Sequence, residues 1–373
     1  MTDPAGEDVV RYEVVRGVAW LTINRPEARN ALNGAVAAGI RDAVDELDAT
    51  ADLRAGVLTG AGGTFSSGMD LKAFLAGEVP SFPGRGLCGI TQTPPRKPLV
   101  GAAEGWALAG GFELLLACDL VVAGASARFG VPEVKRGLLA GAGGAMLLAQ
   151  RIPRALALEM LLTGDPFDAA RAADIGLVNR VTDDGQALPT AIELAERIAA
   201  NGPLALIATK QIAAGGTDWP ADQRWDQMAA LMAPVFGSAD AREGARGSAM
   251  WLLYVCDAGL LVTSGLIHLH LWDIAYRHVK TLDVLFLVQV VFCLLAALTL
   301  LLTRHLLVTL GALALMAGTI VGFLLARSVG IFGFKLTFSS GLANLVLVIE
   351  IVAIIALAIT GALLLRRRGS AAR

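Results

Sequence analysis

Two carboxylates that follow glycine-rich turns have residue types and positions that could do chemistry. Glu113 comes directly after the turn Ala109-Gly-Gly-Phe, and Glu133 comes directly after Phe129-Gly-Val-Pro. All four histidines lie at or beyond residue 268, so the first 250 residues contain none. This excludes Ser-His-Asp and Cys-His nucleophilic schemes and histidine-ligated metals from that part of the chain. Carboxylates are therefore the leading proton carriers for any general acid–base catalysis there.

The glycine-rich turns could also hold a ligand with their backbone. None has the spacing GxGxxG before a helix or GxxxxGK[ST], so the residues of a dinucleotide or P-loop site are missing. Glycine lets the backbone approach a ligand closely. Two backbone N–H groups that point at one oxygen can form an oxyanion hole. The four cysteines form no CxxC pair, so we expect no zinc site.

These turns and carboxylates lie in three segments, TFSSGMDLK (64–72), GWALAGGFELLLACD (105–119) and FGVPEVKRG (129–137). Together with neighbouring segments, they resemble the enoyl-CoA hydratase/isomerase (crotonase) superfamily. The resemblance extends over roughly residues 10–247. The other segments that carry it are 24–33, 141–144, 162–165 and 176–179.

The resemblance implies an acyl-CoA site and assigns roles by position. In this family two backbone N–H groups polarise the thioester carbonyl of an acyl-CoA, and their positions correspond here to Met69 and Gly110. The two glutamates of the hydratases correspond to Glu113 and Glu133. The presence of both favours an enoyl-CoA hydratase, in which Glu113 would orient and deprotonate water and Glu133 would protonate Cα in a syn-addition to a trans-2-enoyl-CoA. An isomerase or another acyl-CoA reaction of the superfamily is the alternative.

The resemblance also implies a path for CoA and an assembly. As in relatives, the pantetheine and adenine of CoA would follow five residues: Ala28, Ser67, Gly68, Asp70 and Leu71. Asp70 could equally be a helix N-cap, because Asp is a favoured cap. CoA is part of the substrate, so we expect no separate cofactor and no metal. We expect a homotrimer or hexamer formed through this part of the chain.

The elements that must position these residues alternate between strand and helix. Apolar residues recur every three or four positions from 32 to 47, which predicts a helix. Short apolar runs at 55–62 and 99–111 predict buried strands that end in glycines, and 112–124 begins as a helix and continues as a strand. The alternation predicts an α/β domain over residues 1–247. The resemblance implies that this is the crotonase-like spiral of ββα repeats.

Residues 248–373 predict a second domain of a different kind. Residues 1–250 carry 22 basic and 29 acidic side chains, whereas the remainder carries 9 and 4. Four apolar runs in this remainder each match the ~20 residues that cross a hydrocarbon core. We therefore expect an all-α region of four transmembrane helices. The runs are 251–271, 282–303, 305–326 and 342–365.

The flanking charges predict how such a protein would lie in the membrane. Arginines at 366–368 close the last run, and the positive-inside rule places them in the cytoplasm. With four spans the first domain then also lies in the cytoplasm, and the acidic start of the chain predicts no secretory leader. We expect a multi-pass protein of the cytoplasmic membrane. The acidic first part has no basic stripe, so no nucleic-acid partner is expected.

The resemblance ends where the apolar runs begin, and three hypotheses follow. The first is a membrane-tethered hydratase. In the second, the apolar region carries the protein's function, as a transporter or scaffold, and the first domain binds acyl-CoA without turnover. The third is a fusion of two adjacent genes. Glu350 and Asp257 are candidate functional residues because ionisable groups in spans are rare, with a helix–helix contact as the alternative for Glu350. His268 is expected near the outer interface.

Overall fold

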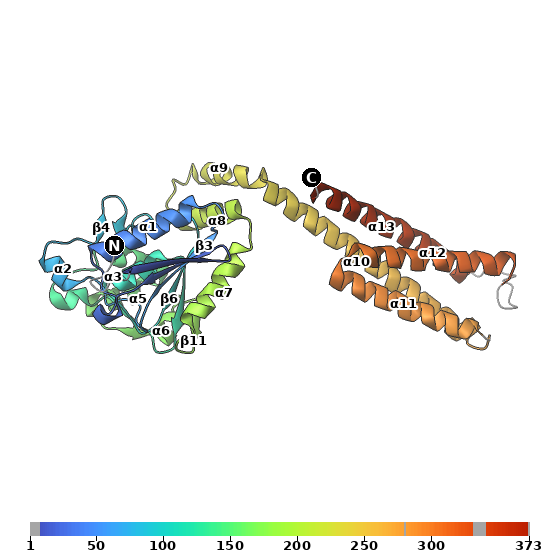
Figure 1. Cartoon of the computed structure of the whole chain (residues 1–373), viewed down its shortest axis with the longest axis horizontal. Coiled ribbons are helices and arrows are strands. Elements are labelled where there is room, and N and C mark those ends of the chain that lie inside the picture. The colour runs from blue at the N-terminus through green and yellow to red at the C-terminus, as the bar shows by residue number, and fades with distance from the viewer. Residues whose placement is uncertain (1–7, 280, 331–340, 372–373) are drawn as a thin grey trace. The chain divides into compact units, whose positions relative to one another are not determined.

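The computed structural model describes residues 8–279, 281–330 and 341–371. The chain divides into two units, Met1–Ser238 and Ala239–Arg373, and each is described by itself (Figure 1). The acidic segment 1–7 lies outside the described residues. The predicted domain boundary after residue 247 falls inside one continuous helix, whereas the two units divide before that helix.

A six-stranded sheet forms the centre of the first unit, with the strand order β1-β2-β3-β6-β8-β11. β1 and β2 form an antiparallel hairpin, and Arg16 and Gly17 both have positive φ at its turn, as a two-residue hairpin loop requires. All other neighbouring pairs are parallel. The strands are β1 (Val10–Val15), β2 (Val18–Ile23), β3 (Ala55–Gly60), β6 (Leu99–Ala103), β8 (Leu120–Gly124) and β11 (Arg180–Thr182).

Helices cover both faces of this sheet, which explains why β3 and β6 are almost entirely apolar and buried. On one face, α1 (Gly34–Ala49) packs its periodic apolar residues into the main core with side chains such as Leu58. On the other face, α7 (Ala187–Ala199) places an alanine at every fourth position against residues such as Val100. Small side chains at this spacing let the helix lie close to the strands.

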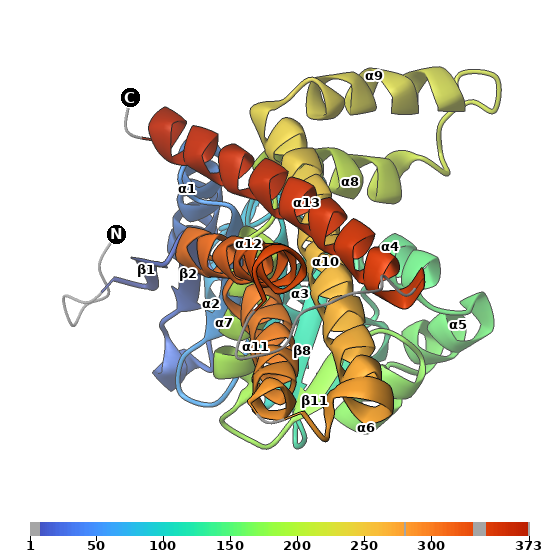
Figure 2. The ribbon, with the colours of Figure 1, turned by 90° about the vertical axis from the view of Figure 1, so that its right-hand side faces the viewer.

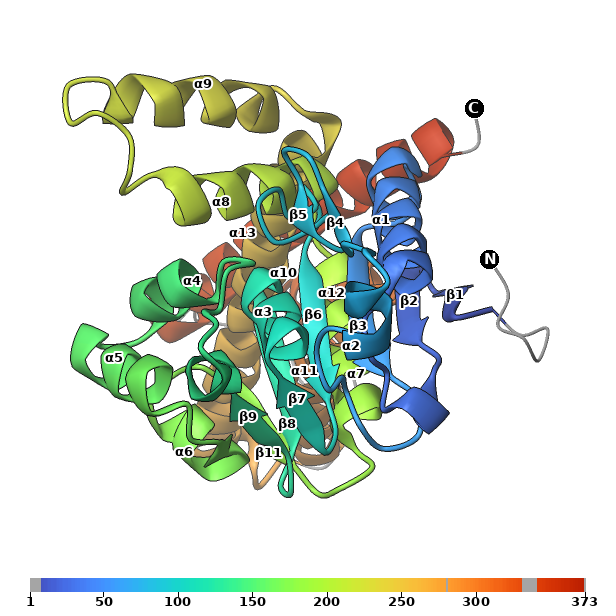
Figure 3. The same ribbon diagram turned by 90° about the vertical axis from the view of Figure 1, so that its left-hand side faces the viewer.

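The chain winds in repeated steps of a central strand, a second-layer strand and a helix. Thus β6 is followed by β7 (Trp106–Leu108) and α3 (Gly110–Ala117), and β8 is followed by β9 (Arg128–Gly130). The second-layer segments also pair in parallel: Ser66 bridges Ala107, and β7 pairs with β9 (Figure 3). Parallel pairing in both layers places equivalent positions of successive steps side by side. The result is an α/β spiral of repeated steps, as the resemblance implies.

The other elements of the first unit lie between and after these steps. They are the 3-10 helices η1 (Pro26–Ala28) and η2 (Pro132–Arg136), the short strands β4 (Ser81–Phe82), β5 (Gly86–Leu87) and β10 (Phe167–Asp168), and the helices α2 (Leu71–Leu75), α4 (Gly144–Arg151), α5 (Arg154–Thr163), α6 (Ala169–Asp174), α8 (Pro203–Gly215) and α9 (Arg224–Phe236).

The second unit is a bundle of four long helices (Figure 2). α10 contacts α11 and α13, and α12 contacts the same two, so the four close into a ring. All four are long and apolar enough to cross a membrane by length and composition. They are α10 (Ala239–Leu271, continued by a π-helical turn at Trp272–Tyr276), α11 (Leu282–Thr303), α12 (Leu306–Ser328) and α13 (Gly341–Ala371).

The first of these helices begins earlier than the apolar run 251–271 predicts. α10 starts at Ala239, because helical hydrogen bonding continues through polar residues that a hydropathy pattern does not register. Inside the bundle, Asp257 is fully buried, and the Thr360 hydroxyl donates a hydrogen bond to its Oδ2 at 2.7 Å. The other carboxylate oxygen, Oδ1, has no hydrogen-bond partner among the described residues.

Candidate active site

Met69 and Gly110 occupy equivalent places in neighbouring steps of the spiral. Ser66 and Ala107 form a parallel bridge between these steps. Met69 lies three residues after Ser66, and Gly110 lies three residues after Ala107. A Cβ atom added to Gly110 would lie 3.8 Å from the backbone nitrogen of Met69, so the two backbones are neighbours. Among the described residues, neither N–H donates a recorded hydrogen bond. The geometry therefore supplies two adjacent free N–H groups, as an oxyanion hole needs.

Unusual backbone conformations on both sides bring these N–H groups together. Ala109 has φ 51° and ψ −128°, a sparsely populated conformation for a residue with a side chain. Such strain costs about 1–3 kcal/mol and is typical of functional sites. Gly68 has φ 90°, and a Cβ there would lie 2.8 Å from both the Ala109 Cβ and the Leu108 carbonyl oxygen. Only glycine fits at position 68.

Two buried polar residues hold the first oxyanion segment in place. Ser66 Oγ donates to the Asn30 carbonyl at 2.8 Å and accepts from the Gly68 N–H at 3.1 Å. The Asn30 side-chain amide donates to the carbonyls of Ala61 and Thr64. Sequence reasoning missed these supports. Both residues lie within the motif segments, but residue type alone does not distinguish the buried Ser66 from its neighbour Ser67.

Glu113 is a buried carboxylate in the first turn of α3, with 3% of its surface exposed. The backbone N–H groups of Ala142 and Gly144 both donate to its Oε1, each at 2.8 Å. Because both bonds go to Oε1, Oε2 is available to a substrate or a water molecule. Burial raises the pKa of Glu113, and repulsion from Glu133 adds to this, although the two N–H donors oppose the rise.

The turn 141–144 has a role that the sequence did not indicate. The resemblance placed it with the segment of the second glutamate, whereas the structure shows that it fixes the first. A Cβ added to Gly144 would lie 2.9 Å from Glu113 Oε1, so a glycine is needed for the carboxylate to approach the N–H. Gly143 precedes it with φ 119°, which turns the chain into α4.

Glu133 lies in the first turn of η2 and is half-buried. Its Oε2 is buried and has no hydrogen-bond partner among the described residues. Burial raises the pKa of Glu133, and the nearby Arg136 lowers it in part. The charge of Glu133 also raises the pKa of Glu113, so the two carboxylates lie close enough to interact. Their environments differ: backbone N–H groups fix Glu113, while one oxygen of Glu133 is unpaired.

The structure also brings the predicted CoA-path residues together. The loop that contains Ala28 pairs with the loop that contains Ser67 and Gly68: the Ser67 N–H donates to the Arg29 carbonyl, and the Leu32 N–H donates to the Gly68 carbonyl. Asp70 and Leu71 follow directly, with the Leu71 side chain exposed. Among the described residues, no three His, Cys, Asp or Glu side chains come together as metal ligands would.

The side chain of Asp70 is an N-cap in the structure. Its Oδ1 accepts hydrogen bonds from the N–H groups of Lys72 and Ala73, which begin α2. Its Oδ2 pairs with the Arg25 guanidinium at 3.2 Å. The carboxylate is thus committed to its own helix and to Arg25.

The comparisons with known proteins identify the class of protein. The enoyl-CoA hydratase/isomerase family model matches residues 13–249, and the chain belongs to this family. The family predicted from the motifs is confirmed. An enoyl-CoA hydratase of Mycobacterium tuberculosis is 42% identical over 240 residues, which are 61% of this chain and 89% of that protein. An (E)-benzylidenesuccinyl-CoA hydratase of Thauera aromatica is 38% identical over 57% of this chain and 84% of that protein.

Solved structures give the same result for the fold. The crystal structure of an enoyl-CoA hydratase from Mycobacterium tuberculosis H37Rv has a TM-score of 0.64 and 52% identity, over 65% of this chain and 96% of that one. An enoyl-CoA hydratase from Mycobacterium marinum gives the same values. Because almost the whole of each structure is covered, the similarity corresponds to a complete enzyme. The family match ends at residue 249, near the start of the apolar runs.

Proposed function

We propose that the first unit is an enoyl-CoA hydratase that adds water to the double bond of a trans-2-enoyl-CoA. The observation that carries this proposal is the pair of glutamates, the buried Glu113 and the half-buried Glu133, which lie close enough to interact and are held in different ways. Addition of water needs one group that removes a proton from water and another that gives a proton to carbon. Relatives named as hydratases, at 38–42% identity, support the same reaction.

In the proposed mechanism, the thioester carbonyl oxygen accepts hydrogen bonds from the N–H groups of Met69 and Gly110. These donors stabilise the enolate that forms when the hydroxyl adds to Cβ. Glu113, fixed through Oε1, takes a proton from water with Oε2, and the resulting hydroxyl adds to Cβ. Glu133 then gives its proton to Cα on the same face, which completes a syn-addition. Burial favours the protonated form of Glu133 that this step needs.

The remaining parts of the proposed site bind CoA. The backbone of Ala28 and of residues 67–71 would follow the pantetheine and adenine, because these two loops lie side by side beside the Met69 N–H. CoA arrives as part of the substrate, and the mechanism needs no separate cofactor and no metal. We also propose a homotrimer or hexamer through the first unit, from the family resemblance.

For the second unit we propose insertion in the cytoplasmic membrane, with the first unit and the C-terminus on the cytoplasmic side. Support comes from four helices that are long and apolar enough to span a bilayer. The arginines at 366–368 support the orientation. Such a tether would hold the hydratase at the membrane surface. The size of the native polypeptide on a blot tests the alternative of two separate gene products.

The experiment that tests the hydratase uses the full chain in mild detergent micelles. Crotonyl-CoA and longer trans-2-enoyl-CoAs are supplied, and loss of enoyl absorbance is followed. We expect Glu113→Gln and Glu133→Gln each to lower kcat by about 10²–10⁴. Glu159→Gln, an exposed glutamate of α5, is the matched control and should leave kcat unchanged. Acyl-CoA binding without turnover would contradict the proposal and favour a binding domain.

A further inference from the structure

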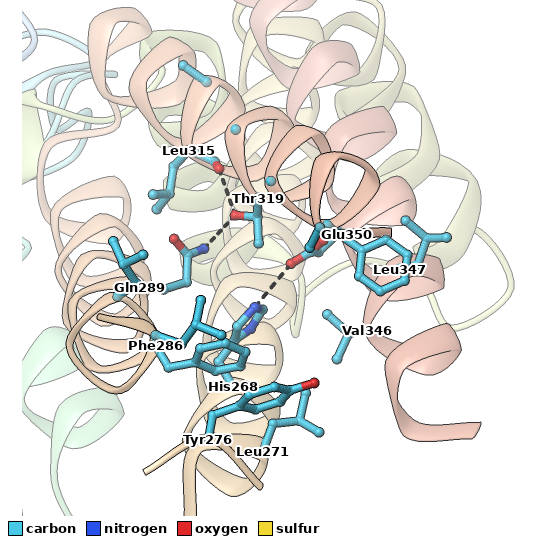
Figure 4. A pocket seen from close by; sticks show the side chains of 17 residues that line it. His268, Leu271, Tyr276, Phe286, Gln289, Leu315, Thr319, Val346, Leu347 and Glu350 are labelled. Atoms are coloured by element: carbon cyan, nitrogen blue, oxygen red, sulfur yellow. Dashed lines mark hydrogen bonds and ion pairs between the residues drawn. The ribbon is translucent and has the colours of Figure 1, made fainter. Parts of the chain in front are cut away.

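A cavity of about 550 Å³ lies among the four helices of the second unit (Figure 4). Helices α10 to α13 and the π-helical turn all contribute to its wall. Most of the wall is apolar, and the polar side chains gather around one residue of α13, Glu350. The polar or ionisable lining residues are His268, Tyr276, Gln289, Thr319 and Glu350.

Glu350 is the polar group in this wall that lacks a partner. It is 1% exposed, and its Oε1 has no hydrogen-bond partner among the described residues. The buried Ser264 hydroxyl likewise has no hydrogen-bond partner among the described residues. By contrast, the Gln289 side-chain amide donates to Thr319 Oγ1 at 2.7 Å, and Thr319 donates to the backbone of its own helix. Those two polar groups are satisfied.

His268 faces Glu350 but does not donate a hydrogen bond to it. Its Nε2 lies 3.6 Å from Glu350 Oε1, which is too long for a hydrogen bond and makes an ion pair only when the ring is protonated. Its Nδ1 lies 2.9 Å from the Ser264 carbonyl oxygen, which can only accept. The ring proton therefore resides on Nδ1. A neutral ring then presents a lone pair, not a donor, to the carboxylate.

The rest of the wall suits a positively charged ligand with an apolar body. Among the described lining residues there is no Lys or Arg to neutralise a carboxylate. The Tyr276 and Phe286 rings stack at 4.6 Å between centroids, and the His268 ring lies 5.5 Å from Phe286. Aromatic faces attract cations, and a buried carboxylate needs a positive partner. The same carboxylate disfavours anions such as fatty acids.

We propose that this cavity binds a small organic cation with an apolar body, whose positive charge pairs with Glu350. The aromatic rings of Tyr276 and Phe286 lie against the cation, and the aliphatic wall packs against its body. The site is separate from the acyl-CoA site, since every lining residue belongs to the second unit.

The test uses the full chain in detergent micelles and two probes of the same shape and opposite charge, tetraphenylphosphonium and tetraphenylborate. Binding is measured by equilibrium dialysis, and only the part that excess unlabelled probe displaces is counted. We expect saturable binding of tetraphenylphosphonium and none of tetraphenylborate. Glu350→Gln should weaken binding of the cation at least about tenfold, because the charge is lost while the shape is kept.

Two further variants make the result decisive. Asp257→Asn removes the other buried carboxylate of the bundle, which does not line the cavity, and should leave cation affinity unchanged. Gly318→Leu keeps Glu350 but adds a side chain where the structure has open space at the cavity wall, and should also weaken binding. If Glu350→Gln does not fold, Gly318→Leu still tests whether the cation occupies this cavity. Equal binding of both probes, or affinity that neither Glu350→Gln nor Gly318→Leu changes, would overturn the proposal.

Discussion

In the first unit the buried carboxylate of Glu113 accepts hydrogen bonds from backbone N–H groups, whereas in the second unit the buried carboxylates of Asp257 and Glu350 face side chains. The difference follows from the backbone. Glycine-rich turns leave N–H groups free to point at a charge, but the interior of a helix uses every N–H for its own hydrogen bonds. A helical bundle must therefore supply partners for a buried charge from side chains or from a ligand.

Beyond the replacement of the two glutamates themselves, the largest expected effect comes from disturbing the backbone donors of Glu113. Gly144→Ala would put a Cβ 2.9 Å from Oε1 and should displace the carboxylate. We expect kcat for enoyl-CoA hydration to fall by about tenfold to 10², with KM little changed, since a displacement of about 1 Å costs up to that much. The matched control is Gly141→Ala in the same turn, whose Cβ would meet only the end of the Leu139 side chain. Equal losses in both variants would contradict the role of the Gly144 N–H.

The pH profile of hydration tests the environments of the two glutamates. The proposed reaction needs Glu113 ionised and Glu133 protonated. Burial raises the pKa of both carboxyl groups. As pH falls, kcat/KM should therefore begin to drop above the ordinary glutamate value of 4.5, and it should drop again at higher pH as Glu133 loses its proton.

The pH profile of the Gly144→Ala variant makes this test sharper. The Gly144 N–H lowers the pKa of Glu113, so weakening that bond should move the acid limb of kcat/KM to higher pH. The Gly141→Ala control should keep the wild-type profile. An acid limb near or below the ordinary glutamate value in the wild-type chain would show that Glu113 is not desolvated as the structure indicates.

In the second unit, Thr360→Val tests whether a side-chain donor is needed. The change removes the hydroxyl that donates to Asp257 and leaves this carboxylate buried without a recorded donor. We expect a loss of about 1–3 kcal/mol in the free energy of unfolding, measured by SDS titration of the full chain in micelles. Thr303→Val is the control, because Thr303 is exposed and bonds only to a carbonyl of its own helix. If both variants unfold at the same SDS fraction, the Asp257 contact does not stabilise the bundle.

The smallest effect is expected at the N-cap of α2. Asp70→Ala removes the hydrogen bonds to Lys72 and Ala73 and should lower the free energy of unfolding by about 1 kcal/mol. Asp70→Asn keeps a capping oxygen but loses the charge that pairs with Arg25, so it should lower the free energy of unfolding by less than Asp70→Ala does. Urea midpoints for loss of hydratase activity in the full chain measure both. A loss for Asn as large as the loss for Ala would mean that the ion pair with Arg25, which both variants lack, matters more than the cap.

The local elements of the first unit could be predicted because their patterns are short-range. Apolar periodicity from 32 to 47 corresponds to α1, and the turn at Arg16-Gly17 is present with the positive φ values that it needs. The motifs also predicted the family, which is confirmed. The contact of Glu113 with the turn 141–144 could not be predicted. It joins residues about thirty positions apart, and it depends on how successive steps of the spiral pack.

In the second unit the sequence predicted where apolar helices lie but not which faces meet. That His268 lies near the outer membrane interface stays a prediction, and the sequence did not indicate that its ring is buried beside Glu350 inside the bundle. Hydropathy averages over all sides of a helix, so it carries no information on the direction of a single side chain. For the same reason, the helix–helix contact that was one alternative for Glu350 became visible only in the structure, together with the cavity.

The parallel bridge between Ser66 and Ala107 has a consequence for how such enzymes diversify. The bridge, and not the chain between its two ends, sets the distance between the Met69 and Gly110 nitrogens. The exposed stretches 76–79 and 92–94, which lie between them, can therefore change length without moving the oxyanion donors. Exposed connecting loops of this kind tolerate insertions while the scaffold that holds the donors is inherited intact.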